Sequence, residues 1–153
     1  MAREPRIVKG SIPWSTVDAQ LRAGIAVILS TVTPEGKPHA LPVWYLWTGR
    51  YVYFATKTAS VKGRNLAAQP WVVAHFGSGE DPLFVDGQVR RITNRTEQAR
   101  VNRAYTAKYV DAVSGEHYGI WAVKGNGLYR IDVRRVVTWR DSSMRGWTEW
   151  RFD

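Results

Sequence analysis

The segment from Arg50 to Pro70 constrains the fold most, because it joins a strand, a polar loop and a helix in one continuous pattern. Its first residues alternate between two faces, one formed by Tyr51, Tyr53 and Ala55 and the other by Val52 and Phe54. This alternation has the period of a pleated strand. Ser60 is suited to cap a helix that Pro70 ends. We therefore predict a strand over residues 50–56 that leads directly into the first turns of a helix.

Hydroxyls and cations are concentrated in the loop and at the start of this helix. Nine positions hold three hydroxyl side chains and three cations, namely Thr56, Lys57, Thr58, Ser60, Lys62 and Arg64. A helix start offers free backbone N–H groups and the positive end of the helix dipole, so it favours an anion such as a phosphate. The alternative interpretation is a solvated, capped helix start with incidental lysines.

The rest of the chain predicts an antiparallel β-barrel. Apolar and alternating patterns predict further strands over residues 25–33, 39–47, 71–77, 83–93 and 127–139, and helices over about residues 13–24 and 94–110. Residues 111–126 and a tail of about residues 140–153 are given no element. About six strands with isolated helices between them favour a mainly β fold, a closed or nearly closed six-stranded antiparallel barrel with helices outside. We expect one domain over residues 1–153.

Some residues within these elements carry more specific expectations. The strand over residues 25–33 is apolar enough to be buried on both faces. Pro42 indicates an edge or a bulge, and Gly87 indicates a bulge or a close backbone approach. Asn94 and Glu97 form a capping-box pattern at the start of the last predicted helix. One stripe of that helix is predicted to face the core, with Val101, Tyr105 and Tyr109.

Composition narrows the classes of partner. The net charge of +9, with 8 Trp and 7 Tyr, favours an anionic, flat partner such as a flavin-type cofactor or a nucleic acid. The cations are spread over several elements, which argues against a nucleic acid. The absence of cysteine excludes disulfides and thiolate sites, and three scattered histidines do not make a metal site. There is no apolar run of about 18 residues and no signal-peptide core, so we expect no membrane association and a cytoplasmic location.

Seven short motifs follow one another along nearly the whole chain. They are Pro34-Glu35-Gly36-Lys37-Pro38, Pro42-Val43-Trp44-Tyr45, Phe54-Ala55-Thr56 before Ser60-Val61-Lys62, Asn65-Leu66 with Pro70-Trp71-Val72, Val85-Asp86-Gly87, Ala107-Lys108-Tyr109 and Val137-Thr138-Trp139. In this order the motifs resemble the pyridoxamine-phosphate-oxidase-like split β-barrel family. The resemblance implies a six-stranded split barrel and a homodimer that binds a flavin or deazaflavin in two symmetric clefts between its subunits.

Two further motifs resemble the deazaflavin-dependent group of this family, the run from Lys62 to Leu66 and the ending Trp150-Arg151-Phe152. That group uses coenzyme F-420, a hydride carrier with a lactyl-phosphate and an oligoglutamate tail. Flavin-binding oxidases have an arginine near residues 41–43 and a Ser-Arg-Lys run at the position of Ser60-Val61-Lys62. Two cations expected for the FMN phosphate are therefore missing, although Lys57 or Arg64 could substitute. The resemblance favours coenzyme F-420, with FMN as the alternative.

The resemblance also assigns roles to residues. The phosphate and carboxylates of the cofactor would be bound by the polar loop and the helix after it, with Thr56, Lys57, Thr58, Ser60, Lys62, Arg64 and Asn65. The strand segment Pro42, Val43 and Trp44 would lie along the cofactor ring. Trp44 and Trp139 would form the walls of the substrate site, although a strand Trp is more often a core residue. No catalytic acid is assigned, because the proton could come from a Tyr or from water.

The sequence therefore predicts an F-420-dependent oxidoreductase that transfers a hydride to a conjugated C=C or C=N bond of a planar organic molecule. Two alternatives stay open within the same fold. One is an FMN-dependent oxidoreductase, and the other is a cofactor-binding or carrier protein without turnover. A nucleic-acid-binding function depends on the net charge alone.

Overall fold

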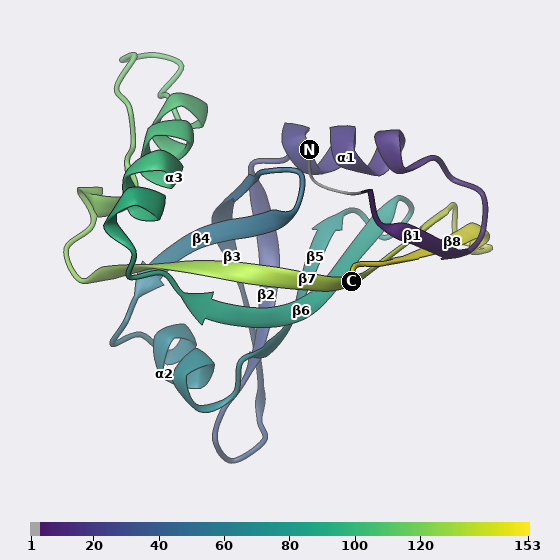
Figure 1. Ribbon diagram of the computed structural model, residues 1–153, viewed down its shortest axis with the longest axis horizontal. Coiled ribbons are helices and arrows are strands. Elements are labelled where there is room, and N and C mark those ends of the chain that lie inside the picture. The colour runs from purple at the N-terminus through teal and green to yellow at the C-terminus, as the bar shows by residue number, and fades with distance from the viewer. Residues whose placement is uncertain (1–3) are drawn as a thin grey trace.

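The computed structural model describes residues 4–153, which form a mainly β molecule with helices around it (Figure 1). The described residues form, in chain order, β1 (Arg6–Lys9), α1 (Trp14–Ala23), β2 (Ala26–Val32), β3 (Pro38–Trp47), β4 (Tyr51–Lys57), α2 (Val61–Ala68), β5 (Trp71–Gly77), β6 (Pro82–Arg91), α3 (Arg95–Lys108), a short 3-10 helix (Ile120–Ala122), β7 (Asn126–Arg140) and β8 (Arg145–Arg151). The strand and helix segments predicted from the sequence are confirmed to within a few residues at their ends.

Six antiparallel strands close into the predicted barrel. Their order is β7-β4-β3-β2-β5-β6, and β6 pairs back to β7 to complete the ring. The 15 residues of β7 make this closure possible. Its first half pairs with β4 from Asn126 to Asp132, and its second half pairs with β8. The six-stranded antiparallel barrel with flanking helices is therefore confirmed.

The tail after β7 contributes a strand that the sequence left unassigned. Residues Arg145–Arg151 form β8, which pairs with β7 on one side and with β1 on the other. Trp150 in this strand is 1% exposed and meets the ring of Trp14 edge-on, 5.5 Å away. In Figure 1, β1 and β8 lie at the end of the molecule opposite α3. The tail thus extends the sheet and anchors α1.

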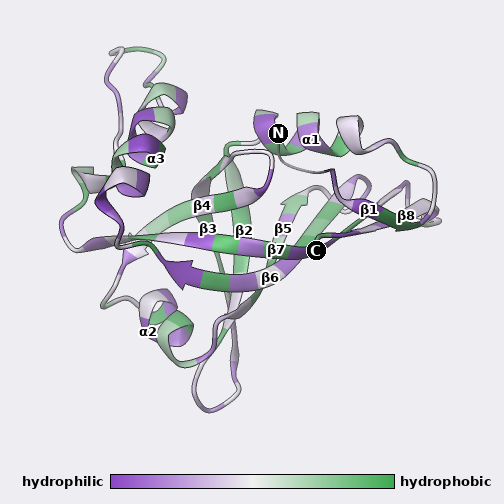
Figure 2. Ribbon diagram, in the orientation of Figure 1, coloured by the Kyte–Doolittle hydropathy of each residue, from purple (hydrophilic) through white to green (hydrophobic). Residues whose placement is uncertain are grey.

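Two apolar clusters lie on the two faces of β4. Val52 and Phe54 belong to the larger cluster, which includes the barrel interior, and Tyr53 belongs to a second cluster with Val101 and Tyr105 of α3. The alternation predicted for β4 is therefore confirmed, as is the buried stripe of α3. Figure 2 shows the same alternation as bands of hydrophobic and hydrophilic residues along β6 and β7.

The expectation that the strand over residues 25–33 is buried on both faces is wrong for the single chain. Val27 and Leu29 are buried, but Ile28 between them is 40% exposed. A barrel strand turns one face to the interior, and nothing in the described chain covers the other face of β2 at this point. Trp71 and Val73 on neighbouring β5 are exposed as well.

Pro42 lies at an unpaired strand edge and Gly87 at a bulge with a close backbone approach, as the sequence predicts. β3 pairs with β4 only through Tyr45, Leu46 and Trp47, so the part of β3 that contains Pro42 has an edge unpaired on that side. The register between β6 and β7 shifts at Asp86 and Gly87. A Cβ atom at Gly87 would overlap the carbonyl oxygen of Asp132, so this strand needs the close backbone approach that glycine allows.

Candidate functional site

A cleft of about 430 Å³ opens where β3 and β4 separate. The two strands pair at Tyr45–Trp47 and then diverge, so the free edge of β3 faces the end of β4 across the gap. Seven of the ten predicted cofactor-binding residues line this cleft: Pro42, Val43, Trp44, Thr56, Lys57, Ser60 and Lys62. The split in the barrel therefore brings the polar loop and the Pro42 strand segment together.

Ser60 organises the turn from β4 into α2. Its Oγ accepts a hydrogen bond from the Gly63 amide at 3.1 Å and donates to the Lys57 carbonyl at 2.6 Å. The Thr56 hydroxyl lies 3.2 Å from the same oxygen. A Cβ at Gly63 would overlap the carbonyl oxygens of Thr58 and Lys57, so α2 begins tightly against the loop. The turn thereby positions Lys57 and Lys62, the two lysines that line the cleft.

Lys57 and Lys62 give the cleft a positive electrostatic bias. Lys57 is exposed and Lys62 is half-buried. The ion pairs found within residues 4–153 all use other cations. The first turn of α2 has no acidic residue either. An anion entering the cleft would therefore meet two ammonium groups that no carboxylate of the described chain neutralises.

The other predicted site residues lie elsewhere. Thr58 lines a separate cavity of about 160 Å³ with Arg91 and Tyr129. Arg64 is exposed and donates to the Ala59 carbonyl at 2.5 Å. Asn65 is buried and donates to the Thr31 hydroxyl at 3.0 Å, so its amide links α2 to β2.

Trp139 also lies outside the cleft. It lies near the C-terminal end of β7, whereas Asn126, which lines the cleft, is the first residue of that strand. Its ring stacks between Phe84, at 5.5 Å, and Trp147, at 5.2 Å. The two tryptophans predicted to wall the substrate site therefore lie apart in the single chain.

The opposite wall of the cleft comes from a part of the chain to which the sequence assigned no function. It consists of Tyr105 on α3 and of residues before and at the start of β7: Tyr118, Gly119, Ile120, Ala122, Val123 and Asn126. Tyr105 was predicted only as a core residue. The irregular segment has no periodicity that could have shown which of its residues face a cleft. Burial raises the pKa of Tyr105 to about 12, so its hydroxyl is protonated at neutral pH.

Lys108 lies half-buried beside the aromatic residues next to the cleft. Its Nζ donates to the Tyr45 carbonyl at 3.1 Å and lies 4.3 Å from the centroid of the Tyr45 ring. These contacts favour the cation, but burial outweighs them and lowers the pKa of Lys108 to about 8, from 10.5. The native state therefore binds this proton less tightly than the unfolded chain does.

This shift predicts a rise in stability at alkaline pH. Between about pH 8 and 10 the unfolded chain keeps the Lys108 proton and the native state releases it, so the free energy of unfolding should rise. Over this pH range, we expect the free energy of unfolding to rise by about 1 kcal/mol more in the wild type than in Lys108→Met. This is less than the full pKa shift would give, because solvent screens a half-exposed group. Urea unfolding at each pH measures it. The raised pKa values of the buried tyrosines lower stability above about pH 10, and the Lys108→Met variant keeps this effect. Parallel curves of unfolding free energy against pH for the two proteins would contradict the prediction.

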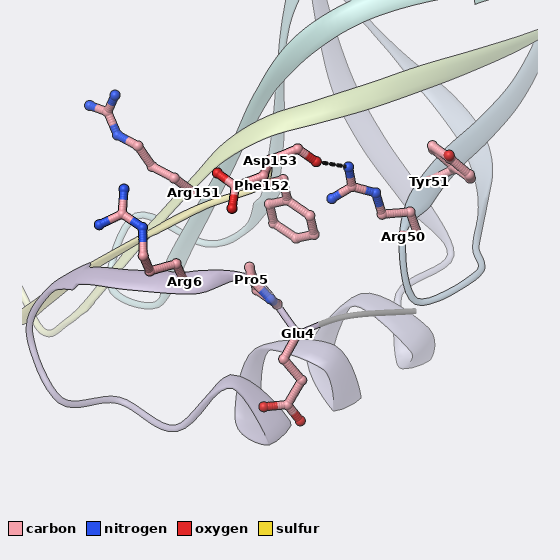
Figure 3. A pocket seen from close by; sticks show the side chains of 8 residues that line it. All are labelled: Glu4, Pro5, Arg6, Arg50, Tyr51, Arg151, Phe152 and Asp153. Carbon is pink, nitrogen blue, oxygen red and sulfur yellow. Dashed lines mark hydrogen bonds between the residues drawn. The ribbon is translucent and has the colours of Figure 1, made fainter. Parts of the chain in front are cut away.

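A second large pocket, of about 390 Å³, lies between β1, the start of β4 and the end of the chain. Figure 3 shows Arg6 and Arg151 on one side of Phe152 and Arg50 on the other. Glu4 and Asp153 also line this pocket, and Arg50 donates to the main-chain oxygen of Asp153 at 2.5 Å. Its cations are thus accompanied by acidic groups, in contrast to those of the cleft.

Two other features bear on the classes of function. None of the helices in the described part of the chain is long and apolar enough to cross a bilayer. Among residues 4–153, no group of three or more His, Cys, Asp or Glu side chains is placed to hold a metal ion.

The closed six-stranded barrel, with its cleft where two strands part, defines a split β-barrel protein. The chain belongs to the pyridoxamine 5'-phosphate oxidase family, whose model matches residues 14–140. A curated relative, the pyridoxine/pyridoxamine 5'-phosphate oxidase of Bacteroides thetaiotaomicron, is 25% identical over 128 residues. The match covers 80% of this chain and 59% of that protein, so the chain spans less than two thirds of the length of this relative.

Solved structures agree on the fold. A conserved hypothetical protein of Mycobacterium tuberculosis, Rv2991, has a TM-score of 0.71 at 20% identity and covers 90% of both chains. An F-420 reductase has a TM-score of 0.59 at 21% identity, over 78% of this chain and 94% of its own. HutZ, the heme storage protein of Vibrio cholerae, has a TM-score of 0.65 at 14% identity, over 78% and 89%. Identities this low show a shared fold and no more.

Proposed function

We propose that this protein is an oxidoreductase that binds coenzyme F-420 in the cleft between β3 and β4. The observation that carries the proposal is the position of Lys57 and Lys62, which form no ion pair within residues 4–153, on one side of the cleft, opposite the free edge of β3. A flat coenzyme with an acidic tail needs both features. Membership in a family of oxidoreductases supports the reaction class, and the missing cations near residues 41–43 and at Val61 favour the deazaflavin over FMN.

The residues present fit this coenzyme. Lys57 and Lys62 would bind its phosphate and carboxylates as point charges. Backbone groups of Pro42, Val43 and Trp44 have no β4 partner and would be available to the ring edge. The reduced coenzyme supplies a hydride when bound. The protein would orient the ring and exclude water, and Tyr105, protonated at neutral pH, lies on the facing wall.

We further propose that the chain works as a homodimer with the cleft at the subunit interface. The outer face of β2, β3 and β5 leaves Ile28, Trp71 and Val73 exposed. The pairing places Pro42 opposite Ile28 and Trp44 opposite Ala26, so this apolar face is continuous with the cleft. A second copy seated there would bury the face and narrow the cleft, because Pro42 and Trp44 belong to both.

Titration of the purified full chain tests the function. We expect saturable binding of coenzyme F-420 by calorimetry, at one coenzyme per chain, and weaker binding of FMN. Sedimentation in the same buffer should give the mass of two chains. Failure to bind F-420 would overturn the proposal. Saturable FMN binding by a yellow protein would assign the FMN alternative, and binding without hydride transfer to a panel of conjugated substrates would assign the carrier alternative.

A further inference from the structure

Trp44 presents part of its indole ring to the cleft, and Tyr109 covers another part. The two rings stack with centroids 4.6 Å apart and planes inclined by only 4°. Trp44 is 43% exposed and lines the cleft, whereas Tyr109 is 4% exposed and does not line it. Tyr118 meets the indole edge-on at 6.0 Å. The phenol ring therefore lies behind the indole, as seen from the cleft.

The hydroxyl of Tyr109 is fixed by the backbones of two strands. The ladder between β2 and β3 ends with the pair Ala26 and Trp44, so Ile25 and Tyr45 would be the next pair. The Tyr109 hydroxyl takes the place of that pairing. It accepts the Tyr45 N–H at 2.8 Å and lies 2.5 Å from the Tyr45 carbonyl and 2.7 Å from the Ile25 carbonyl, to one of which it donates.

The ring of Tyr109 is held equally firmly. Tyr105 packs on it at 4.5 Å, and the Nζ of Lys108 lies 5.5 Å from its centroid. Both side chains belong to α3, whereas Trp44 belongs to β3. The indole on β3 therefore packs against a ring that contacts at the C-terminal end of α3 hold in place, and this packing limits the rotamers of Trp44.

We propose that Tyr109 is a positioning residue of the cleft. It holds the Trp44 indole as a flat wall on which the planar conjugated ring of a bound coenzyme stacks. The chemistry of the ligand rests on the proposed function, and the coupling between Tyr109 and Trp44 does not. An indole already fixed in place gains stacking contact without first losing rotamer freedom, so affinity for a planar ring should depend on Tyr109.

The test is a double-mutant cycle on the full chain with coenzyme F-420 as the probe. We expect Tyr109→Leu to weaken binding about five- to tenfold and Trp44→Leu to weaken it by a similar factor. Adding Tyr109→Leu to the Trp44→Leu protein should change affinity less than about twofold. Tyr109→Phe, which keeps the ring, should restore most of the affinity. Ile92→Ala, in the same apolar cluster, is the control for general loss of packing and should leave affinity unchanged.

Near-ultraviolet circular dichroism gives a readout that needs no coenzyme. The difference between the wild type and Trp44→Leu isolates the signal of a fixed Trp44. That difference should vanish in the Tyr109→Leu background and persist in the Ile92→Ala background. Its persistence without Tyr109, or independent effects of the two substitutions on binding, would overturn the proposal. If F-420 does not bind the wild type, the function proposed above fails, and the dichroism still decides the role of Tyr109.

Discussion

Replacing Trp150 by alanine is expected to lower the free energy of unfolding by about 3–5 kcal/mol, the usual cost of removing a large aromatic side chain from a core. Trp150 is 1% exposed and is among the largest fully buried side chains of the protein. Its ring packs against Trp14, which also meets Phe152 at 5.4 Å. The substitution would leave a cavity between α1 and the end of the chain. Urea unfolding followed by far-ultraviolet circular dichroism measures the loss.

Trp121 supplies the matched control for this experiment. It is 46% exposed, so Trp121→Ala should change stability by about 0.5 kcal/mol or less. Trp150→Phe should recover part of the loss, because a phenyl ring fills part of the cavity. If Trp150→Ala costs no more than Trp121→Ala, then the tail does not anchor α1 and the packing described above is wrong.

This role of the tail shows what the sequence could not indicate. The barrel strands were predictable because each one alternates between an apolar and a polar face, or is apolar throughout. β1 has no such signal, since its four residues, Arg6–Lys9, do not alternate between apolar and polar, and all four are exposed. Nothing in the sequence of β8 shows whether Trp147 and Trp150 cover a site, close an interface or enter the core. The pairing of β8 with β1 and β7 places Trp150 in the sheet, and its burial against Trp14 shows that it faces the core.

The candidate site also contains residues that the sequence could predict and residues that it could not. Thr56, Lys57, Ser60 and Lys62 are neighbours in sequence, so a helix cap and its cations could be found from local pattern alone. Thr58 and Arg64 share that pattern but point away from the cleft. The far wall, from Tyr118 to Asn126, depends on the course of an irregular segment and had no pattern to detect. Tyr109 was predicted as a core residue, and its place behind Trp44 is a property of tertiary structure.

The Lys62→Ala variant is expected to bind coenzyme F-420 more weakly by about 1.5–3 kcal/mol, or roughly 10- to 150-fold, if this ammonium holds an otherwise desolvated phosphate. Calorimetric titration of the full chain measures the change. Lys37→Ala removes one positive charge from the turn between β2 and β3, outside the cleft, and should leave affinity within about twofold. Lys62→Arg keeps the charge and should retain most of the affinity.

Stability distinguishes a binding role from a structural one, because the two predict opposite signs. Lys62 lies in the first turn of α2, where the helix dipole is positive and no acidic residue balances it. A cation there is unfavourable by about 0.3–1 kcal/mol in a helix without a ligand. Lys62→Ala should therefore leave the free energy of unfolding unchanged or slightly raised while affinity falls. Unchanged affinity would make Lys62 an ordinary surface charge, and lost stability would make it a structural residue. A bound anion would offset this unfavourable placement of the cation. Lys62 is suited to such a role because it is half-buried, lines the cleft and has no carboxylate partner among residues 4–153.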